Sequence, residues 1–134
     1  MFPELVITGY PPQDLLMKDS FIRDNLNVLQ IISKKSTIPI IVGYVNKENG
    51  ALYNSAAICY EGKTQYSCNK ILLPTYDVFD EARYFNSGEN PSTFTVPIGN
   101  EIINIGLQIC EDMWDNDYET KVSKIQMEMG ANIL

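Results

Sequence analysis

Cys110 is the residue of this sequence best placed for nucleophilic chemistry. It follows directly on an apolar run, residues 102–109, and precedes two acids, Glu111 and Asp112. The run predicts a buried strand of about eight residues, and α/β proteins place reactive groups at the carboxyl ends of such strands. A lone cysteine at a strand end is more often a small buried hydrophobic residue than a nucleophile. From the residues alone, both interpretations stay open.

The absence of histidine restricts the partners that a reactive thiol could have. It excludes Ser-His and Cys-His catalysis within the chain, and it removes the commonest ligand of transition metals. A nucleophilic Cys110 would therefore need a carboxylate or a lysine to activate it. Glu4 is an acid in an apolar stretch, and Lys70 ends a predicted strand among apolar residues. Lys70 either extends its amine to solvent, which is the commoner case, or projects into a pocket as a fixed cation.

The elements that must position these residues alternate between helix and strand. A helix with an apolar stripe is expected after Ser20, and a second one over residues 119–129, ended by Gly130. The expected strands are residues 38–45, 52–60, 64–70, 93–98 and 102–109, with a further buried strand beginning at 131. Hairpin turns are predicted at 49–50, 61–63 and 99–100, and the aromatic loop 75–90 could wall a pocket. This order is typical of a layered α/β protein with a mixed sheet.

Composition narrows the function class. The chain has 134 residues, 45% of them hydrophobic, and a formal net charge of −7, so a nucleic-acid partner is not expected. No run approaches the roughly 18 apolar residues of a membrane span, and the amino terminus lacks the features of a signal peptide. The chain is therefore expected to be cytoplasmic, with no membrane partner. Cys59 and Cys68 lie within predicted strands and are expected to be reduced, inert core thiols.

Three segments carry a family resemblance. Residues 2–16 (FPELVITGYPPQDLL), 70–85 (KILLPTYDVFDEARYF) and 109–114 (ICEDMW) resemble, in order, the three signatures of the nitrilase (carbon–nitrogen hydrolase) superfamily. In detail they are most similar to the amino-terminal glutaminase domains of glutamine-dependent NAD(+) synthetases, along nearly the whole chain. The fold that this resemblance implies is an α-β-β-α sandwich, α/β in class.

The resemblance also implies that the sandwich is incomplete at both ends. Residues 1–134 are then expected to be the central part of a single glutaminase domain, without the synthetase domain. Because missing strands would expose sheet edges, we expect these residues alone to be marginally stable and nearly inactive.

The resemblance assigns roles by position in the three motifs. It implies that the catalytic residues are Glu4 as general base and acid, Lys70 as oxyanion stabiliser and Cys110 as nucleophile, with Glu81 orienting Lys70. The backbone N–H of Glu111 would also face the oxyanion. The implied glutamine-binding residues are Tyr10, Tyr76, Phe79 and Glu111. For Tyr10 and Phe79, core packing is an equal alternative. Asp112 and Trp114 are expected to fix the turn after the nucleophile.

The implied activity is release of ammonia from glutamine through a glutamyl thioester. The ammonia would pass to a synthetase domain that uses ATP and Mg²⁺, while the present segment needs no cofactor or metal. A homo-oligomer is expected for the full-length protein. Two alternatives remain: a stand-alone nitrilase-type amidase acting on another amide, and a non-catalytic fragment that forms part of an interface.

Overall fold

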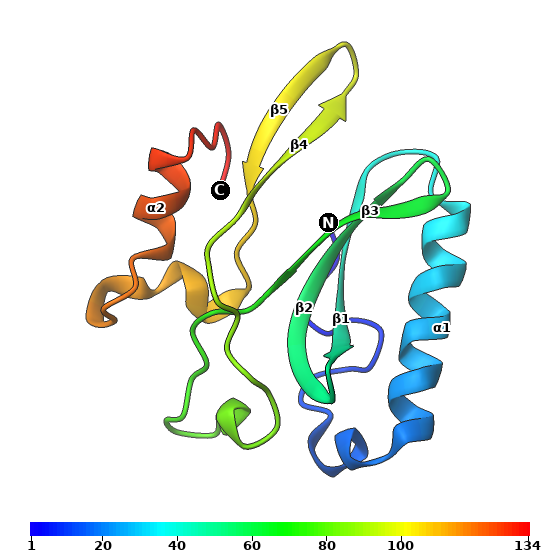
Figure 1. Ribbon diagram of the computed structural model, residues 1–134, viewed down its shortest axis with the longest axis vertical. Coiled ribbons are helices and arrows are strands. Elements are labelled where there is room, and N and C mark those ends of the chain that lie inside the picture. Colours follow the sequence, from blue (N-terminus) through cyan, green and yellow to red (C-terminus); the bar gives the residue numbers. More distant parts are fainter.

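Four layers of secondary structure form the chain, as the computed structural model of residues 1–134 shows (Figure 1). Helix α1 (Asp19–Lys35) covers one face of a three-stranded sheet made by β1 (Ile40–Glu48), β2 (Ala51–Tyr60) and β3 (Lys63–Asn69). A hairpin of β4 (Thr93–Ile98) and β5 (Glu101–Gly106) lies on the other side of the sheet, and α2 (Val122–Glu128) lies outside the hairpin. The predicted α/β class and the α-β-β-α layer order are confirmed.

Turn chemistry sets the register of the sheet. The β1–β2 turn is Asn49-Gly50 and the β2–β3 turn is Glu61-Gly62, and all four residues have positive φ. Two successive positive φ values are typical of the two-residue turns that match the twist of antiparallel strands. The third predicted turn, at residues 99–100, joins β4 to β5 with Ile98 opposite Glu101.

Strand β2 is the centre of the core because both of its faces are covered. On one face Ile58 packs with Val96 and Ile109, from the hairpin side. On the other face Ala57 and Cys59 pack with α1 and β1. Side chains alternate between the two faces of a strand, so the small residues of β2 allow close approach from both directions.

The predicted strand leading to Cys110 ends early, at Gly106. Its partner β4 begins at Thr93, which lies opposite Gly106, so no ladder partner remains beyond that residue. Side chains replace the ladder: Gln126 donates to the carbonyl of Leu107, and Asp112 accepts from the N–H of Ile109. Residues 107–109 are thus an extended lead-in rather than a strand.

Smaller differences concern the ends of other elements. Strand β1 runs on to Glu48, α1 begins at Asp19 without a side-chain cap, and α2 begins only at Val122. The strand predicted from residue 131 is wrong: Ile133 forms one isolated parallel bridge with Ile105 and is half exposed.

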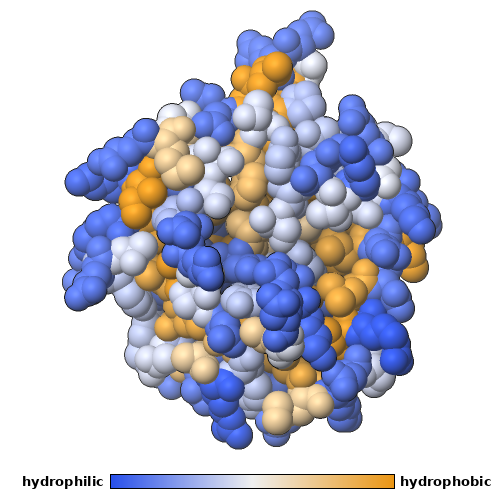
Figure 2. All heavy atoms as spheres, in the orientation of Figure 1, coloured by the Kyte–Doolittle hydropathy of each residue, from blue (hydrophilic) through white to orange (hydrophobic).

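Hydrophilic residues dominate the face seen in Figure 2, and apolar groups show in separate zones. One zone lies at the tip of the β4–β5 hairpin, where Ile98 and Ile102 are exposed. No helix of the chain is both long and apolar enough to cross a membrane.

Candidate active site

Lys70 is the centre of a buried charge cluster. Its side chain is 0% exposed, and its Nζ lies 2.8 Å from Glu4 Oε1 and 2.9 Å from Glu81 Oε1. The three residues come from the amino-terminal segment, the end of β3 and the 3₁₀ turn Glu81–Arg83. The expectation that Lys70 more often reaches solvent is therefore wrong, because two carboxylates compensate its charge in the interior.

Electrostatics keep Lys70 charged. Burial by itself lowers the pKa of the Lys70 ammonium, but the hydrogen bonds and charges of Glu4 and Glu81 outweigh burial, and the pKa is raised. One ammonium facing two carboxylates leaves the cluster with excess negative charge. Lys70 is thus a fixed cation near neutral pH, suited to hold a developing negative charge rather than to act as a base.

Glu4 and Glu81 differ in how many of their oxygens accept hydrogen bonds. Both oxygens of Glu81 are occupied: Oε1 accepts from Lys70 and from the hydroxyl of Tyr10 at 2.8 Å, and Oε2 accepts from Asn54 at 3.2 Å. Glu4 accepts only at Oε1, from Lys70 and from Asn54 at 2.7 Å. Its Oε2 has no donor within the protein, so Glu4 is the carboxylate with an atom available for proton transfer.

A tight backbone turn at Glu4 positions this carboxylate. Leu5 has φ +48°, a left-handed conformation that is unfavourable for a branched side chain. The turn crosses β1 at Gly43, where a Cβ atom would lie 2.6 Å from the carbonyl oxygen of Pro3 and 2.9 Å from the carbonyl carbon of Glu4. Gly43 therefore permits a contact between backbones that any larger residue would block.

Cys110 is exposed and begins the 3₁₀ turn Cys110–Met113, so the interpretation as a buried core residue is wrong. Its φ of +49° is a strained value of the kind found at functional sites. Cys110 and Glu4 line the same mostly apolar cavity of about 300 Å³. Burial raises the pKa of the Cys110 thiol, the charge of Glu4 adds to the rise, and Lys70 opposes it. The thiol is therefore protonated at neutral pH and needs a base to become a nucleophile.

Asp112 ties the Cys110 turn to the strand end that carries Lys70. Its Oδ1 accepts from the N–H groups of Ile71 and Leu72 at 3.0 and 2.9 Å, and its Oδ2 accepts from Ile109 at 3.0 Å. Asp112 thus fixes the turn, as predicted. Trp114 contributes to the turn through its backbone, whose N–H donates to the carbonyl of Glu111 at 2.9 Å, while its side chain is 65% exposed.

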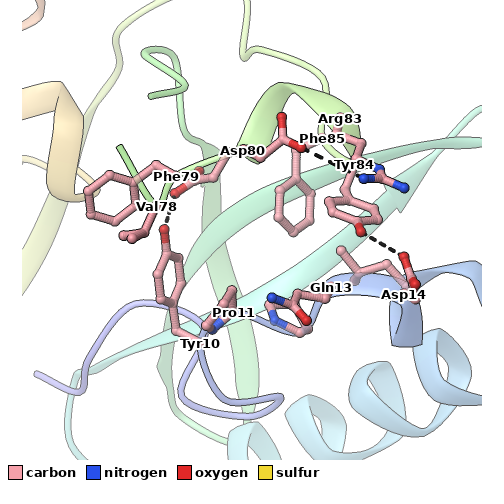
Figure 3. A pocket seen from close by; sticks show the side chains of 13 residues that line it. Tyr10, Pro11, Gln13, Asp14, Val78, Phe79, Asp80, Arg83, Tyr84 and Phe85 are labelled. Atoms are coloured by element: carbon pink, nitrogen blue, oxygen red, sulfur yellow. Dashed lines mark hydrogen bonds and ion pairs between the residues drawn. The ribbon is translucent and has the colours of Figure 1, made fainter. Parts of the chain in front are cut away.

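Two of the four predicted glutamine-binding residues line a second hollow (Figure 3). Tyr10 and Phe79 pack against each other there, with ring centroids 6.3 Å apart, and the Tyr10 hydroxyl donates to Glu81. Phe79 also packs edge-on against Tyr76, at 5.8 Å. Cys110 does not line this hollow.

Glu111 turns away from solvent beside Cys110. It is buried, and its two oxygens accept from the hydroxyls of Tyr76 and Tyr118 at 2.9 and 2.8 Å. Burial and this hydrogen bond raise the pKa of Tyr118 to about 12. Sequence reasoning missed Tyr118, and nothing in its local pattern indicates it. The substrate roles of Tyr10, Tyr76, Phe79 and Glu111 stay predictions.

Sequence reasoning also missed Asn54, which is fully buried on β2 and donates to both glutamates. A signal was present, because Asn54 shares the strand face of Ala56 and Ile58 by period-2 alternation. A polar amide in such a buried row needs a partner. No group of three or more His, Cys, Asp or Glu side chains is arranged to hold a metal ion.

Comparison with known proteins identifies the relatives of this chain. The sequence model of the carbon-nitrogen hydrolase family matches residues 1–132. A glutamine-dependent NAD(+) synthetase of Thermotoga maritima is 41% identical over 118 residues, which are 86% of this chain and 20% of the relative. One from Synechocystis is 40% identical over 148 positions, covering 98% of this chain and 26% of the relative.

A solved structure shares the fold. The glutamine-dependent NAD+ synthetase of Acinetobacter baumannii, in complex with ADP, superposes with a TM-score of 0.84 at 31% identity, over 99% of this chain and 24% of that protein. The chain spans about a fifth to a quarter of the length of the relatives it matches.

Proposed function

The chain belongs to the carbon-nitrogen hydrolase family, and from that premise we propose that it is the central part of a glutaminase domain that supplies ammonia for NAD(+) synthesis. The observation that carries this proposal is the buried Glu4–Lys70–Glu81 cluster, in which Glu4 keeps one oxygen without a donor and lines the same cavity as the exposed Cys110. The relatives, named as glutamine-dependent NAD(+) synthetases, support glutamine as the substrate.

The first half of the proposed reaction makes a thioester. Glu4 takes the proton of the Cys110 thiol, and Sγ attacks the side-chain amide carbon of glutamine. Lys70 and the backbone N–H of Glu111 hold the oxygen that becomes negative. When the C–N bond breaks, Glu4 gives its proton to the leaving nitrogen, so ammonia departs and a glutamyl thioester remains on Cys110.

The second half restores the enzyme. Glu4 takes a proton from water, the hydroxide attacks the thioester carbonyl, and Lys70 again holds the oxyanion. The C–S bond breaks, Cys110 recovers the proton from Glu4, and glutamate leaves. One carboxylate therefore serves both steps, which is why a chain without histidine can catalyse the reaction.

The remaining parts of the proposal concern the full-length protein. We infer that the ammonia passes to a synthetase domain that uses ATP and Mg²⁺, and that the full-length protein is a cytoplasmic homo-oligomer. The residues of the present chain would need no cofactor for their own step.

Release of glutamate from glutamine by the full-length protein tests this function. We expect Cys110→Ala to abolish it and Cys68→Ala to retain it, because the half-buried Cys68 thiol of β3 makes no hydrogen bond to Glu4, Lys70 or Glu81. Full activity of Cys110→Ala would overturn the proposal. Hydrolysis of other amides with no action on glutamine would favour the stand-alone amidase instead. One observation favours that alternative. Both oxygens of Glu111, a predicted glutamine-binding residue, already accept hydrogen bonds from tyrosine hydroxyls.

A further inference from the structure

Asn54 contacts every charged residue of the buried cluster. Its Nδ2 donates to Glu4 Oε1 at 2.7 Å and to Glu81 Oε2 at 3.2 Å. Its backbone carbonyl accepts from the N–H of Lys70 at 2.8 Å. Asn54 is fully buried in the middle of the central strand β2, so its position is fixed by the sheet rather than by a mobile loop.

The orientation of the Asn54 amide is set by the two glutamates. Rotating the amide by half a turn would place its oxygen against both carboxylates and lose both hydrogen bonds. In the orientation present, Oδ1 is buried without a hydrogen-bond partner. An unpaired buried acceptor lowers stability, and a leucine of similar size would leave no polar atom unpaired at this position. The hydrogen bonds that Nδ2 donates to Glu4 and Glu81 therefore explain why an amide occupies this position.

We propose that Asn54 is a positioning residue that, together with Lys70, holds Oε1 of Glu4 and leaves Oε2 as the atom that exchanges a proton with Cys110. This inference rests on the proposed function. Both donors meet the same oxygen of Glu4, so the carboxylate cannot rotate without breaking two hydrogen bonds. The remaining oxygen then keeps one direction through both halves of the reaction.

The neutrality of Asn54 matters as much as its geometry. Glu4 is surrounded by the charged or titratable groups of Lys70, Glu81, Tyr10 and Cys110. A second cation in the place of Asn54 would hold the proton-free carboxylate too firmly for it to act as a base. A neutral amide donor orients the carboxylate without adding a second positive charge beside it.

Asn54→Leu in the full-length protein tests the proposal. Without the amide, Lys70 is the only remaining donor to Oε1 of Glu4, so the carboxylate can rotate away from Cys110. The kcat falls about tenfold or more because the base is less well oriented. The KM for glutamine stays within about twofold, because Asn54 is fully buried and touches no substrate.

Asn25→Leu is the matched control. Asn25 is also buried, and its side chain bonds both backbone groups of Val45, at 2.6 and 3.1 Å, which joins α1 to β1. Its replacement removes a buried amide without touching the cluster. We expect it to lower the unfolding midpoint while leaving the kcat for glutamate release within about twofold of wild type.

The outcomes distinguish the inferred role of Asn54 from the proposed glutaminase function. If Asn54→Leu does not fold, Asn54→Ser carries the same test, with a smaller fall in kcat. A kcat unchanged in the folded Asn54 variant, a KM that rises as much as kcat falls, or an equal fall of kcat in Asn25→Leu overturns this inference alone. A wild-type protein that releases no glutamate overturns the proposed function and this inference with it.

Discussion

Replacing Lys70 by methionine tests how far the fold depends on its buried charge cluster. Methionine keeps much of the side-chain volume and removes the charge. Glu4 and Glu81 would then be left facing each other with only Asn54 and Tyr10 as donors. Breaking a buried ion pair by removing one partner costs about 3–5 kcal/mol, a large share of the roughly 5–15 kcal/mol that stabilises a typical protein.

Lys47→Met is the control for this variant. Lys47 Nζ lies 2.8 Å from Asp19 Oδ1, the same distance as between Lys70 and Glu4, but its side chain is 40% exposed and that of Asp19 is 88% exposed. Exposed pairs contribute about 0–1 kcal/mol. Since the Lys70–Glu4 and Lys47–Asp19 bonds are equal in length, the difference between the variants measures the combined effect of burial and of the second carboxylate, Glu81.

The assay is urea unfolding followed by circular dichroism. At pH 7 we expect Lys70→Met to lose about 3–5 kcal/mol and Lys47→Met less than about 1 kcal/mol. A loss in Lys70→Met no larger than that in Lys47→Met would show that the buried cluster does not stabilise the fold.

Three further variants probe the turns around the cluster. Gly43→Ala places a Cβ atom 2.6 Å from the Pro3 carbonyl, so Glu4 must shift, and we expect glutamate release to fall about a hundredfold; an unchanged kcat contradicts this. In Glu4→Gln the pKa of the Cys110 thiol falls, because a negative charge that raises it is gone; iodoacetamide should therefore alkylate Cys110 with a midpoint at lower pH than in wild type, whereas a higher midpoint would speak against the assigned charges. Asp112→Ala leaves two buried N–H groups and one partly buried N–H group unpaired and should cost about 3 kcal/mol or more in urea unfolding; a loss under about 1 kcal/mol would show that Asp112 does not hold the turn.

The parts of the fold that local chemistry dictates could be predicted from the sequence. Asn49-Gly50 and Gly99-Asn100 specify hairpins, because few residues other than glycine and asparagine tolerate positive φ. The end of β5 could not be predicted, since the apolar pattern continues to Ile109. What ends the strand is the start of its partner at Thr93, which is tertiary information.

The candidate site, like the fold, could be predicted only in part from the sequence. Residue types and the absence of histidine limit which groups could activate Cys110, but they do not show that Lys70 is buried. Its burial depends on Glu4 and Glu81, which are 66 and 11 positions away in sequence. The family motifs supplied that pairing. Asn54 lies outside the motifs, and only the folded structure places it within hydrogen-bond distance of both glutamates.

Mass spectrometry of the Cys110 peptide shows directly whether Cys110 is the nucleophile that attacks glutamine. The full-length protein is mixed with glutamine, quenched in acid within one turnover, and digested. We expect a glutamyl group on Cys110 in wild type and its absence in Glu4→Gln, where no base accepts the thiol proton. Glutamate release without any adduct on Cys110, or an adduct on Cys59 or Cys68 instead, would show that Cys110 is not the nucleophile.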